Sequence, residues 1–309
     1  MATSKRGSAK KSSAGTKAGG KGRGEPVEIT REVLRRMPLP RTRAEDDKEA
    51  RGRVLVVGGS TETVGAIILA GTAALRAGAG KLQVAMAERE GGGAAVAYVL
   101  PEARFLSGDE GELAKYLGEA DAVCIGPGWT EERPRGPAAH FFLSRTRKAA
   151  VVLDAQAIVN LLMSGELPRS WLSRAVVTPN ADEFAEVFRR GARPAPRDLL
   201  GSARAAASSS GAVIVLKGRE TFVVAPDGRA FVNHAGNVGL ATSGSGDVLA
   251  GVIAGLAARG AAPFEAAVWG VHLHALAGDR LAARVGPLGY LARELPAEVP
   301  RLMAELSGD

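Results

Sequence analysis

The 309-residue chain is poor in cysteine, histidine and aromatic side chains, and each shortage excludes a class of structure. Cys124 is the only cysteine, so one chain can form neither a disulfide framework nor a cysteine-based zinc site. The four histidines are scattered and have no metal-ligand spacing, so we predict no side-chain cluster that holds a metal. Aromatic residues make up only 5% of the chain, which favours small-residue helices packed on a sheet over an aromatic-rich β-sandwich.

Long apolar runs are also missing. No run reaches the roughly 18–20 residues that are needed to span a bilayer. The N-terminus has no apolar core of the kind that a signal peptide carries. We therefore expect a cytoplasmic protein without a membrane partner, long enough to bury one large α/β core.

The positive charge is concentrated at the N-terminus. Residues 1–24 contain seven Lys and Arg and no Asp or Glu, and removing these seven from the total of 40 leaves 33 basic against 33 acidic residues. The Ser/Gly/Ala/Lys composition of this segment predicts a disordered tail over 1–24, ahead of one domain over 25–309. A solvated extension without a specific partner is favoured, with weak, salt-sensitive contact to nucleic acid or an acidic surface as the alternative.

Short apolar runs alternate with helix-like runs from residue 53 onward. Strands are expected at 54–59, 82–87, 122–128, 150–155, 175–180 and 213–218, with a β-hairpin over 221–234. Helices are expected at 66–77, near 132–147, and at 246–259, 264–284 and 288–306. The strands are apolar on both faces, which is typical of a mostly parallel sheet covered by helices on both sides. We predict an α/β sandwich that binds ligands at the carboxyl ends of its strands, with no second domain and no repeat.

Gly-rich or polar segments follow most of the expected strands. They are GGSTETVGA (58–66), GPGWT (126–130), Asp154, TPNADE (178–183) and KGRET (217–221). Each has a simpler interpretation: a tight turn for the glycines, a helix cap for Asp154 or Asn180, a solvated strand end for Lys217. Their arrival at one edge of a parallel sheet indicates a cleft better than any single motif does.

The segment Thr242–Asp247 carries the strongest local signal. Hydroxyls and glycines stand directly before an apolar helix, where backbone N–H groups and the positive helix end suit a bound anion. A carboxylate at that place, Asp247, is typical of a base beside a phosphoryl group, although capping is the simpler role. Neither a Walker A sequence nor a GxGxxG after the first strand is present, which disfavours a P-loop NTPase and a conventional dinucleotide dehydrogenase.

These motifs, in their order, resemble the ADP-dependent (S)-NAD(P)H-hydrate dehydratases of the ribokinase superfamily. The resemblance covers about residues 28–306 and is carried by GRVLVVGGS, GTAALRAGAGKLQVA, GPGW, LDAQAI, VTPN, VLKGRET and, most specifically, NHAGNVGLATSGSGDVLAGVIAGL. It implies a ribokinase-like three-layer sandwich and a homotetramer. In this family the domain is often fused to an epimerase domain, of which the 309 residues are expected to contain none.

The resemblance also implies roles for particular residues. Asp247 matches the catalytic aspartate, and it and three further positions match contacts with the hydrate: Ala66, Gly128 and Asn180. Nucleotide-binding positions are expected at Lys217, Gly218, Arg219, Glu220, Thr221, Asn237, Gly244, Ser245 and Gly246. ADP is the implied co-substrate, with Mg²⁺ bridging its phosphates.

The implied reaction is the repair of hydrated NADH or NADPH. A hydroxyl leaves poorly, and transfer of a phosphoryl group to it creates a good leaving group. Asp247 accepts the hydroxyl proton, backbone N–H groups of Gly244 to Gly246 steady the phosphoryl group, and NAD(P)H, AMP and phosphate are the products.

Three departures from the family pattern leave alternatives open. The His-Pro-Gly-Glu of the family is Asn180 to Glu183 here, its His-Lys-Gly is Asp47 to Glu49, and a usual glycine is Ser243. Asparagine carries no positive charge, and the 47–49 change is expected to remove a phosphate-facing element. The alternatives are an ATP-dependent kinase of a vitamin-like alcohol and a nucleotide-binding member with weakened catalysis.

Overall fold

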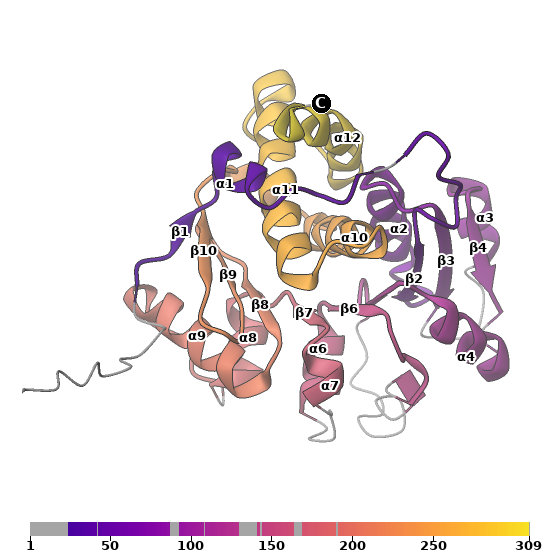
Figure 1. Ribbon diagram of the computed structural model, residues 1–309, viewed down its shortest axis with the longest axis horizontal. Helices are drawn as coiled ribbons and strands as arrows, with labels where there is room; N and C mark the ends of the chain where they lie inside the picture. The colour runs from indigo at the N-terminus through magenta and orange to yellow at the C-terminus, as the bar shows by residue number, and fades with distance from the viewer. Residues whose placement is uncertain are drawn as a thin grey trace, which may run out of the picture.

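The computed structural model describes residues 24–41, 43–86, 93–107, 109–129, 141–142, 144–163, 169–189 and 191–308 (Figure 1). All of the tail predicted over 1–24 except Gly24, and most of the helix expected near 132–147, therefore lie outside the described residues. No helix among the residues described is long and apolar enough to cross a membrane.

The described residues form one ten-stranded sheet in the order β1-β10-β9-β8-β7-β6-β5-β2-β3-β4. Its strands are β1 Val27–Glu28, β2 Arg53–Gly58, β3 Lys81–Met86, β4 Ala103–Leu106, β5 Ala122–Ile125, β6 Ala150–Leu153, β7 Ala175–Val177, β8 Val213–Leu216, β9 Thr221–Val224 and β10 Ala230–Asn233. All neighbouring pairs are parallel except the two that β9 makes, with β8 and with β10. The mostly parallel sheet predicted from the sequence is confirmed, and the expected hairpin is β9–β10.

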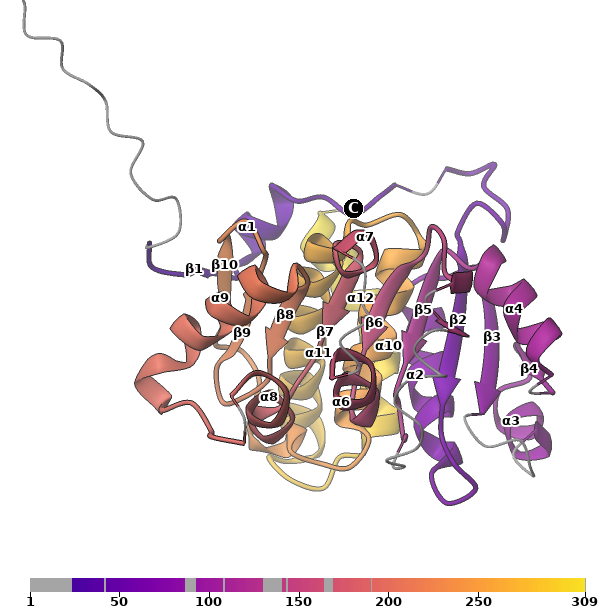
Figure 2. The same ribbon diagram turned by 90° about the horizontal axis from the view of Figure 1, so that it is seen from below.

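Helices cover both faces of the sheet (Figures 1 and 2). The helices are α1 Arg31–Arg35, α2 Val64–Arg76, α3 Gly93–Val99, α4 Glu110–Glu119, α6 Gln156–Leu162, α7 Arg169–Leu172, α8 Ala181–Phe188, α9 Leu199–Ser210, α10 Ser245–Ala258, α11 Pro263–Val285 and α12 Leu295–Ser307, with 3₁₀ turns η1 Pro196–Asp198, η2 Val238–Leu240 and η3 Ala292–Glu294. Along β2, Val54 and Val56 join the core under α2, α10, α11 and α12, while Leu55 and Val57 join the core under α4, α6 and α9. This alternation produces the predicted three-layer sandwich.

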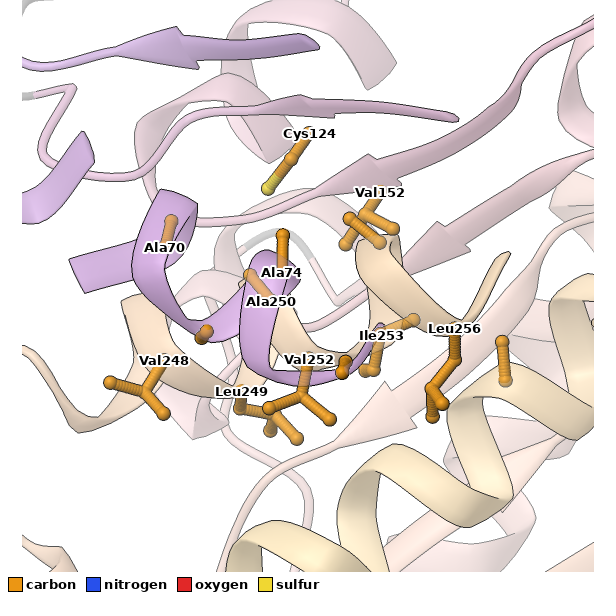
Figure 3. Packing of buried hydrophobic residues seen from close by; sticks show 14 of the residues in the cluster. Ala70, Ala74, Cys124, Val152, Val248, Leu249, Ala250, Val252, Ile253 and Leu256 are labelled. Carbon is orange, nitrogen blue, oxygen red and sulfur yellow. The ribbon is translucent and has the colours of Figure 1, made fainter. Parts of the chain in front are cut away.

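Helix α10 is placed by close packing against α2, as Figure 3 shows. A Cβ at Gly251 would lie 2.1 Å from the carbonyl oxygen of Ala70, and one at Gly255 would lie 2.4 Å from that of Ala74. Only glycine permits this approach, since a methyl group at either position would overlap the backbone of α2. The contact fixes α10 on the sheet and brings its N-terminus to the carboxyl ends of the strands.

The sequence-based boundaries differ from the structure at the C-terminus and at one edge. The helix expected at 288–306 is wrong over its first turns, because Gly289 has a φ of 97° and a 3₁₀ turn precedes α12, which begins at Leu295. The short elements β1, α1, α3, β4 and α4 were not assigned from the sequence. Their burial patterns are weak, as in β1, where both residues are exposed.

Candidate functional site

A cavity of about 950 Å³ opens at the carboxyl ends of the central strands. Its floor comes from residues that follow strands, among them Asp154 after β6, Asn180 after β7 and Lys217 after β8. Its walls come from residues 233–242, the N-terminal turn of α10 and one face of α11. The strand-end motifs singled out in the sequence thus meet at one edge of the sheet, where α/β folds bind ligands.

The turn before α10 exposes backbone donors to this cavity. Gly244 is the N-cap residue of α10 in the left-handed conformation, with a φ of 86°. The Ser245 N–H donates to the carbonyl of Thr242 at 3.2 Å, whereas the following N–H groups of Gly246 and Asp247 have no backbone partner recorded in the described residues. Two free N–H groups at the positive end of a 14-residue helix suit an anion such as phosphate.

Asp247 lies in the first turn of α10, partly buried in the cavity. Burial, reinforced by the negative charge of Asp154, raises the pKa of its carboxyl group to about 7. The Lys217 ammonium and a hydrogen bond from the Gly128 N–H oppose the shift only in part. A carboxyl group with this pKa exchanges a proton near neutral pH, as a general base requires.

Lys217 and Asp154 form an ion pair on the cavity floor. The Lys217 Nζ lies 2.9 Å from Asp154 Oδ1 and 3.9 Å from Glu183 Oε2. Burial opposes the charge on Lys217, but the carboxylates of Asp154, Glu183 and Asp247 together raise its pKa. Lys217 is therefore a fixed cation, and its interpretation as a solvated strand end is wrong.

The wall formed by residues 233–240 is held against α11 by hydrogen bonds. The Asp279 carboxylate accepts hydrogen bonds from the Gly236 N–H at 2.9 Å and the Asn237 Nδ2 at 3.0 Å. Asn237 Oδ1 in turn accepts from the Tyr290 hydroxyl at 2.9 Å. Elsewhere on α11, His272 Nδ1 lies 2.8 Å from Asn233 Oδ1 at the end of β10. These contacts hold Asn237 in the wall of the cavity.

His274 of α11 connects the same helix to the anion-binding turn. Its Nε2 lies 3.0 Å from Ser245 Oγ, and both residues are buried. Burial lowers the pKa of His274 to about 4, so the ring is neutral and bonds the Ser245 hydroxyl without adding charge. The Ser245 side chain is thus held toward α11 at the edge of the cavity.

Asn180 begins α8 with a capping box. Its Oδ1 accepts from the N–H groups of Asp182 and Glu183, at 2.8 Å and 3.0 Å, and Glu183 Oε2 accepts from the Asn180 N–H at 2.7 Å. The capping role weighed from the sequence is therefore present. Asn180 and Glu183 also line the cavity, so the same turn presents an amide and a carboxylate to a ligand.

Most of the predicted site residues lie together. The cavity lining includes Asn180, Lys217, Gly218, Arg219, Thr221, Asn237, Gly244, Ser245, Gly246 and Asp247. Glu220 is not part of this lining and instead contacts His234 at 3.2 Å. Ala66 and Gly128 are not part of the lining, but they lie next to the cavity, because the Gly128 N–H is a hydrogen-bond donor to Asp247. These two residues pack so closely that a Cβ at Gly128 would be 2.5 Å from that of Ala66.

The segment Asp47 to Glu49 lies at the opposite end of the sheet. Glu49 forms ion pairs with Arg53 at the start of β2 and with Lys81 at the start of β3. Because the cavity lies at the carboxyl ends of the strands, the expectation that the 47–49 change removes a phosphate-facing element is wrong. The change from the family pattern there leaves the cavity intact.

Four residues of the site had no catalytic or binding role in the sequence-based hypothesis: Asp154, Glu183, His274 and Asp279. Asp154 was noticed as a strand-end carboxylate, with helix capping as the equal alternative. The structure excludes capping, because Ala155 is the N-cap residue of α6 and no side chain caps that helix. His274 and Asp279 had no distinct local signal, because α11 also carries the polar residues Glu265, His272, Arg280 and Arg284.

Comparison with known proteins agrees with this geometry. A family model described as NAD(P)H-hydrate dehydratase matches residues 54–301. The ADP-dependent (S)-NAD(P)H-hydrate dehydratase of Xanthomonas campestris is 42% identical over 292 residues, which are 90% of this chain and 96% of the relative. The bifunctional NAD(P)H-hydrate repair enzyme of Escherichia coli is 36% identical over 83% of this chain, which spans about half (48%) of that relative.

Solved structures give the same result. A ribokinase-like superfamily protein from Enterococcus faecalis superposes with a TM-score of 0.81 at 26% identity, covering 92% of this chain and 97% of its own. The ADP/ATP-dependent NAD(P)H-hydrate dehydratase from Bacillus subtilis, co-crystallised with ATP/Mg²⁺, superposes with a TM-score of 0.70 at 27% identity over 91% and 99%. With a ribokinase-like sandwich, a family match over most of its length and an anion-binding turn next to Asp247, this chain belongs to the NAD(P)H-hydrate dehydratase family.

Proposed function

We propose that this protein dehydrates the S form of hydrated NADH or NADPH in an ADP-dependent reaction that yields NAD(P)H, AMP and phosphate. One observation carries the proposal: a carboxyl group with a pKa of about 7, that of Asp247, stands in the anion-binding turn of α10 at the edge of a cavity of about 950 Å³. The identity of the substrate is supported by the 42% identical Xanthomonas relative, whose name states this activity.

The chemistry follows from these groups. Asp247 takes the proton of the substrate hydroxyl, whose oxygen forms a bond to the terminal phosphorus of ADP as the bond to AMP breaks. The N–H groups of Gly246 and Asp247 and the Lys217 ammonium face the charge that develops on the phosphoryl oxygens. The C–O bond of the phosphorylated substrate then breaks, assisted by the ring nitrogen, and phosphate leaves with the electron pair of that bond. Loss of a proton from the adjacent ring carbon to solvent or to the departing phosphate restores the reduced nicotinamide.

The nucleotide fits the part of the cleft between the 217–221 segment and the wall formed by residues 233–240. Arg219 and Thr221 line one side, and Val238 and Leu240 give the other side an apolar surface suited to a base. Hydrated dinucleotide would approach Asp247 from the side of Ala66 and Gly128, with Asn180 at the floor. We assign the nucleotide to the first set of residues and the hydrate to the second.

Magnesium fits this site as a partner of the nucleotide phosphates. The described residues contain no group of three side chains able to cage a metal, but Mg²⁺ bound to a nucleotide needs only one or two carboxylates besides phosphate oxygens and water. Glu183 would hold it, because it lines the cavity and only its Oε2 has a hydrogen bond recorded among the described residues. When bound, the ion would neutralise phosphate charge.

The test is to mix purified protein with hydrated NADH and ADP and to follow the absorbance of the reduced nicotinamide. Recovery of absorbance that depends on both protein and ADP is expected, with ATP run in parallel. No recovery, together with stoichiometric conversion of ATP to ADP in the presence of an alcohol acceptor, would overturn the dehydratase in favour of a small-molecule kinase. Nucleotide binding without either turnover would favour a catalytically weakened member.

We also propose that the protein works as a cytoplasmic homotetramer. The resemblance to the family supports the assembly, and several large apolar side chains are exposed, including Tyr98 and Val99 on α3 and Leu288 near α12. Light scattering after size-exclusion chromatography measures the assembly directly, and a monomer at micromolar concentration would contradict it.

A further inference from the structure

The carboxylate of Asp154 is held in an unusual way directly after β6. The next residue, Ala155, has a φ of 50° and is the one non-glycine residue with a positive φ among those described. Such a conformation costs about 1–3 kcal/mol and persists only where the surroundings impose it. It ends the strand so that Ala155 takes the N-cap position of α6, and Asp154, 3% exposed, turns toward the cleft instead of capping the helix.

Two side chains meet the same oxygen of this carboxylate. Asp154 Oδ1 lies 2.7 Å from the hydroxyl of Thr178, which is fully buried, and 2.9 Å from the Nζ of Lys217. Thr178 belongs to the segment after β7 and Lys217 to the segment after β8, so the carboxylate joins three neighbouring strand ends. A charged pair in this position has little freedom to rearrange.

The pair lies directly under the anion-binding turn. A Cβ at Gly246 would be 3.4 Å from the Lys217 Nζ and 3.7 Å from Asp154 Oδ2. The absence of a side chain at Gly246 therefore leaves the ammonium open toward the space that the free N–H groups face. Lys217 also has other carboxylates to pair with, since Glu183 is 3.9 Å away and Asp247 is close enough to raise its pKa.

We propose that Asp154 is a positioning residue that keeps the Lys217 ammonium under Gly246, where Lys217 contacts the phosphoryl group during its transfer. This inference rests on the proposed function and deepens it. Lys217 keeps its proton throughout, while the hydroxyl proton goes to Asp247 and the AMP oxygen takes the electron pair of the broken P–O bond. Without Asp154, Lys217 would turn to Glu183 or Asp247, and its charge would be lost from the reacting phosphorus.

The experiment is a double-mutant cycle with Asp154→Asn, Lys217→Met and the double variant. NADH recovery at saturating hydrate gives kcat and the KM for ADP, and a separate fluorescence titration gives the ADP dissociation constant. We expect each single variant to lower kcat by about 10²-fold, as loss of a charge-stabilising donor does, with the ADP dissociation constant changed less than about fivefold. The double variant should be no slower than the slower single variant, because both act through one ammonium.

Matched controls separate positioning from a role in folding. Lys81→Met removes a lysine that is also paired with a carboxylate, Glu49, at the far end of the sheet, and should leave kcat unchanged. Thr178→Val should lower kcat by about tenfold, the effect of one hydrogen bond, and Thr178→Ser should recover most of that loss. Thermal unfolding confirms that each variant is folded.

Three results would overturn the proposal: wild-type kcat in Asp154→Asn, losses that multiply in the double variant, or losses that fall on KM alone. If the wild type proves to be a kinase and not a dehydratase, the same four proteins are compared by their kcat for phosphoryl transfer from ATP to the alcohol acceptor. A failure of the proposed function is thus distinguishable from a failure of the positioning role.

Discussion

The two ends of the sheet treat charge in opposite ways. At the amino ends of β2 and β3, Arg53 pairs with Glu49 and Glu119 and Lys81 pairs with Glu49, so two cations face two carboxylates. At the carboxyl ends of β6 and β8, one cation, Lys217, faces the carboxylates of Asp154, Glu183 and Asp247.

The difference shows which end carries the chemistry. The balanced pairs are 27% to 43% exposed, and ion pairs of this kind contribute little to stability because water and salt screen them. At the carboxyl ends Asp154 is buried, the other three groups are half-buried, and the charges are unbalanced, so burial raises the pKa of Glu183 and that of Asp247 reaches about 7. Such a set is unfavourable until a ligand completes it, and bound phosphate with its cation would do so.

Removal of the base should have the largest effect. Asp247→Asn keeps the shape of the side chain but cannot accept a proton, so kcat should fall by about 10²–10⁴-fold. The measurement is steady-state NADH recovery, with the ADP dissociation constant as the control for an intact site. Turnover within tenfold of the wild type would mean that another group is the base.

The pH dependence of activity should show the raised pKa of Asp247. Only the carboxylate form accepts a proton, so kcat/KM should rise about tenfold per pH unit below pH 7 and level off above it. An aspartate with its ordinary pKa near 4 would give a flat profile between about pH 5.5 and pH 8. A flat profile would therefore contradict the environment described for this carboxyl group.

The Asp247 carboxylate should lower the free energy of unfolding of the ligand-free protein at alkaline pH. Its pKa is raised in the folded state, so the folded state binds the proton more tightly, and stability is lost as the pH rises from about 4 through 7. Asp247→Asn should therefore increase the free energy of unfolding by about 1–3 kcal/mol at about pH 8, and by less at about pH 5. Urea unfolding at the two pH values measures this, and equal stabilities of the two proteins at about pH 8 would contradict it.

The smallest effect is expected at the amino end. Glu49→Gln breaks exposed ion pairs with Arg53 and Lys81 and should lower the free energy of unfolding only slightly, with the loss reduced at high salt. It should leave kcat unchanged. A loss of activity would show that charge at the two ends is coupled, against the comparison drawn above.

The regular part of the fold could be predicted from the sequence. Six apolar runs and the Asp227-Gly228 turn indicated the parallel strands and the hairpin, because strands buried on both faces are uniformly apolar. The edge elements were missed, since β1 and β4 are short and partly exposed and have no such signal. The start of α12 was missed because helical periodicity continues through Gly289, and its positive φ depends on the folded chain.

The site could be predicted where its residues are contiguous. Gly244, Gly246 and Asp247 stand together before an apolar helix, and the pattern alone indicates their chemistry. The link from Asp154 to Thr178 and Lys217 joins residues 24 and 63 positions apart. Only the order of the strands brings these residues together, and no local pattern encodes that order.

The most direct test of the account is the stoichiometry of one reaction with hydrated NADH and ADP, resolved by chromatography of the nucleotides and an assay for phosphate. If a phosphoryl group from ADP activates the hydroxyl next to Asp247, one AMP and one phosphate should appear for each NADH recovered. Recovery of NADH without matching AMP, or phosphate released from ADP without NADH, would contradict it.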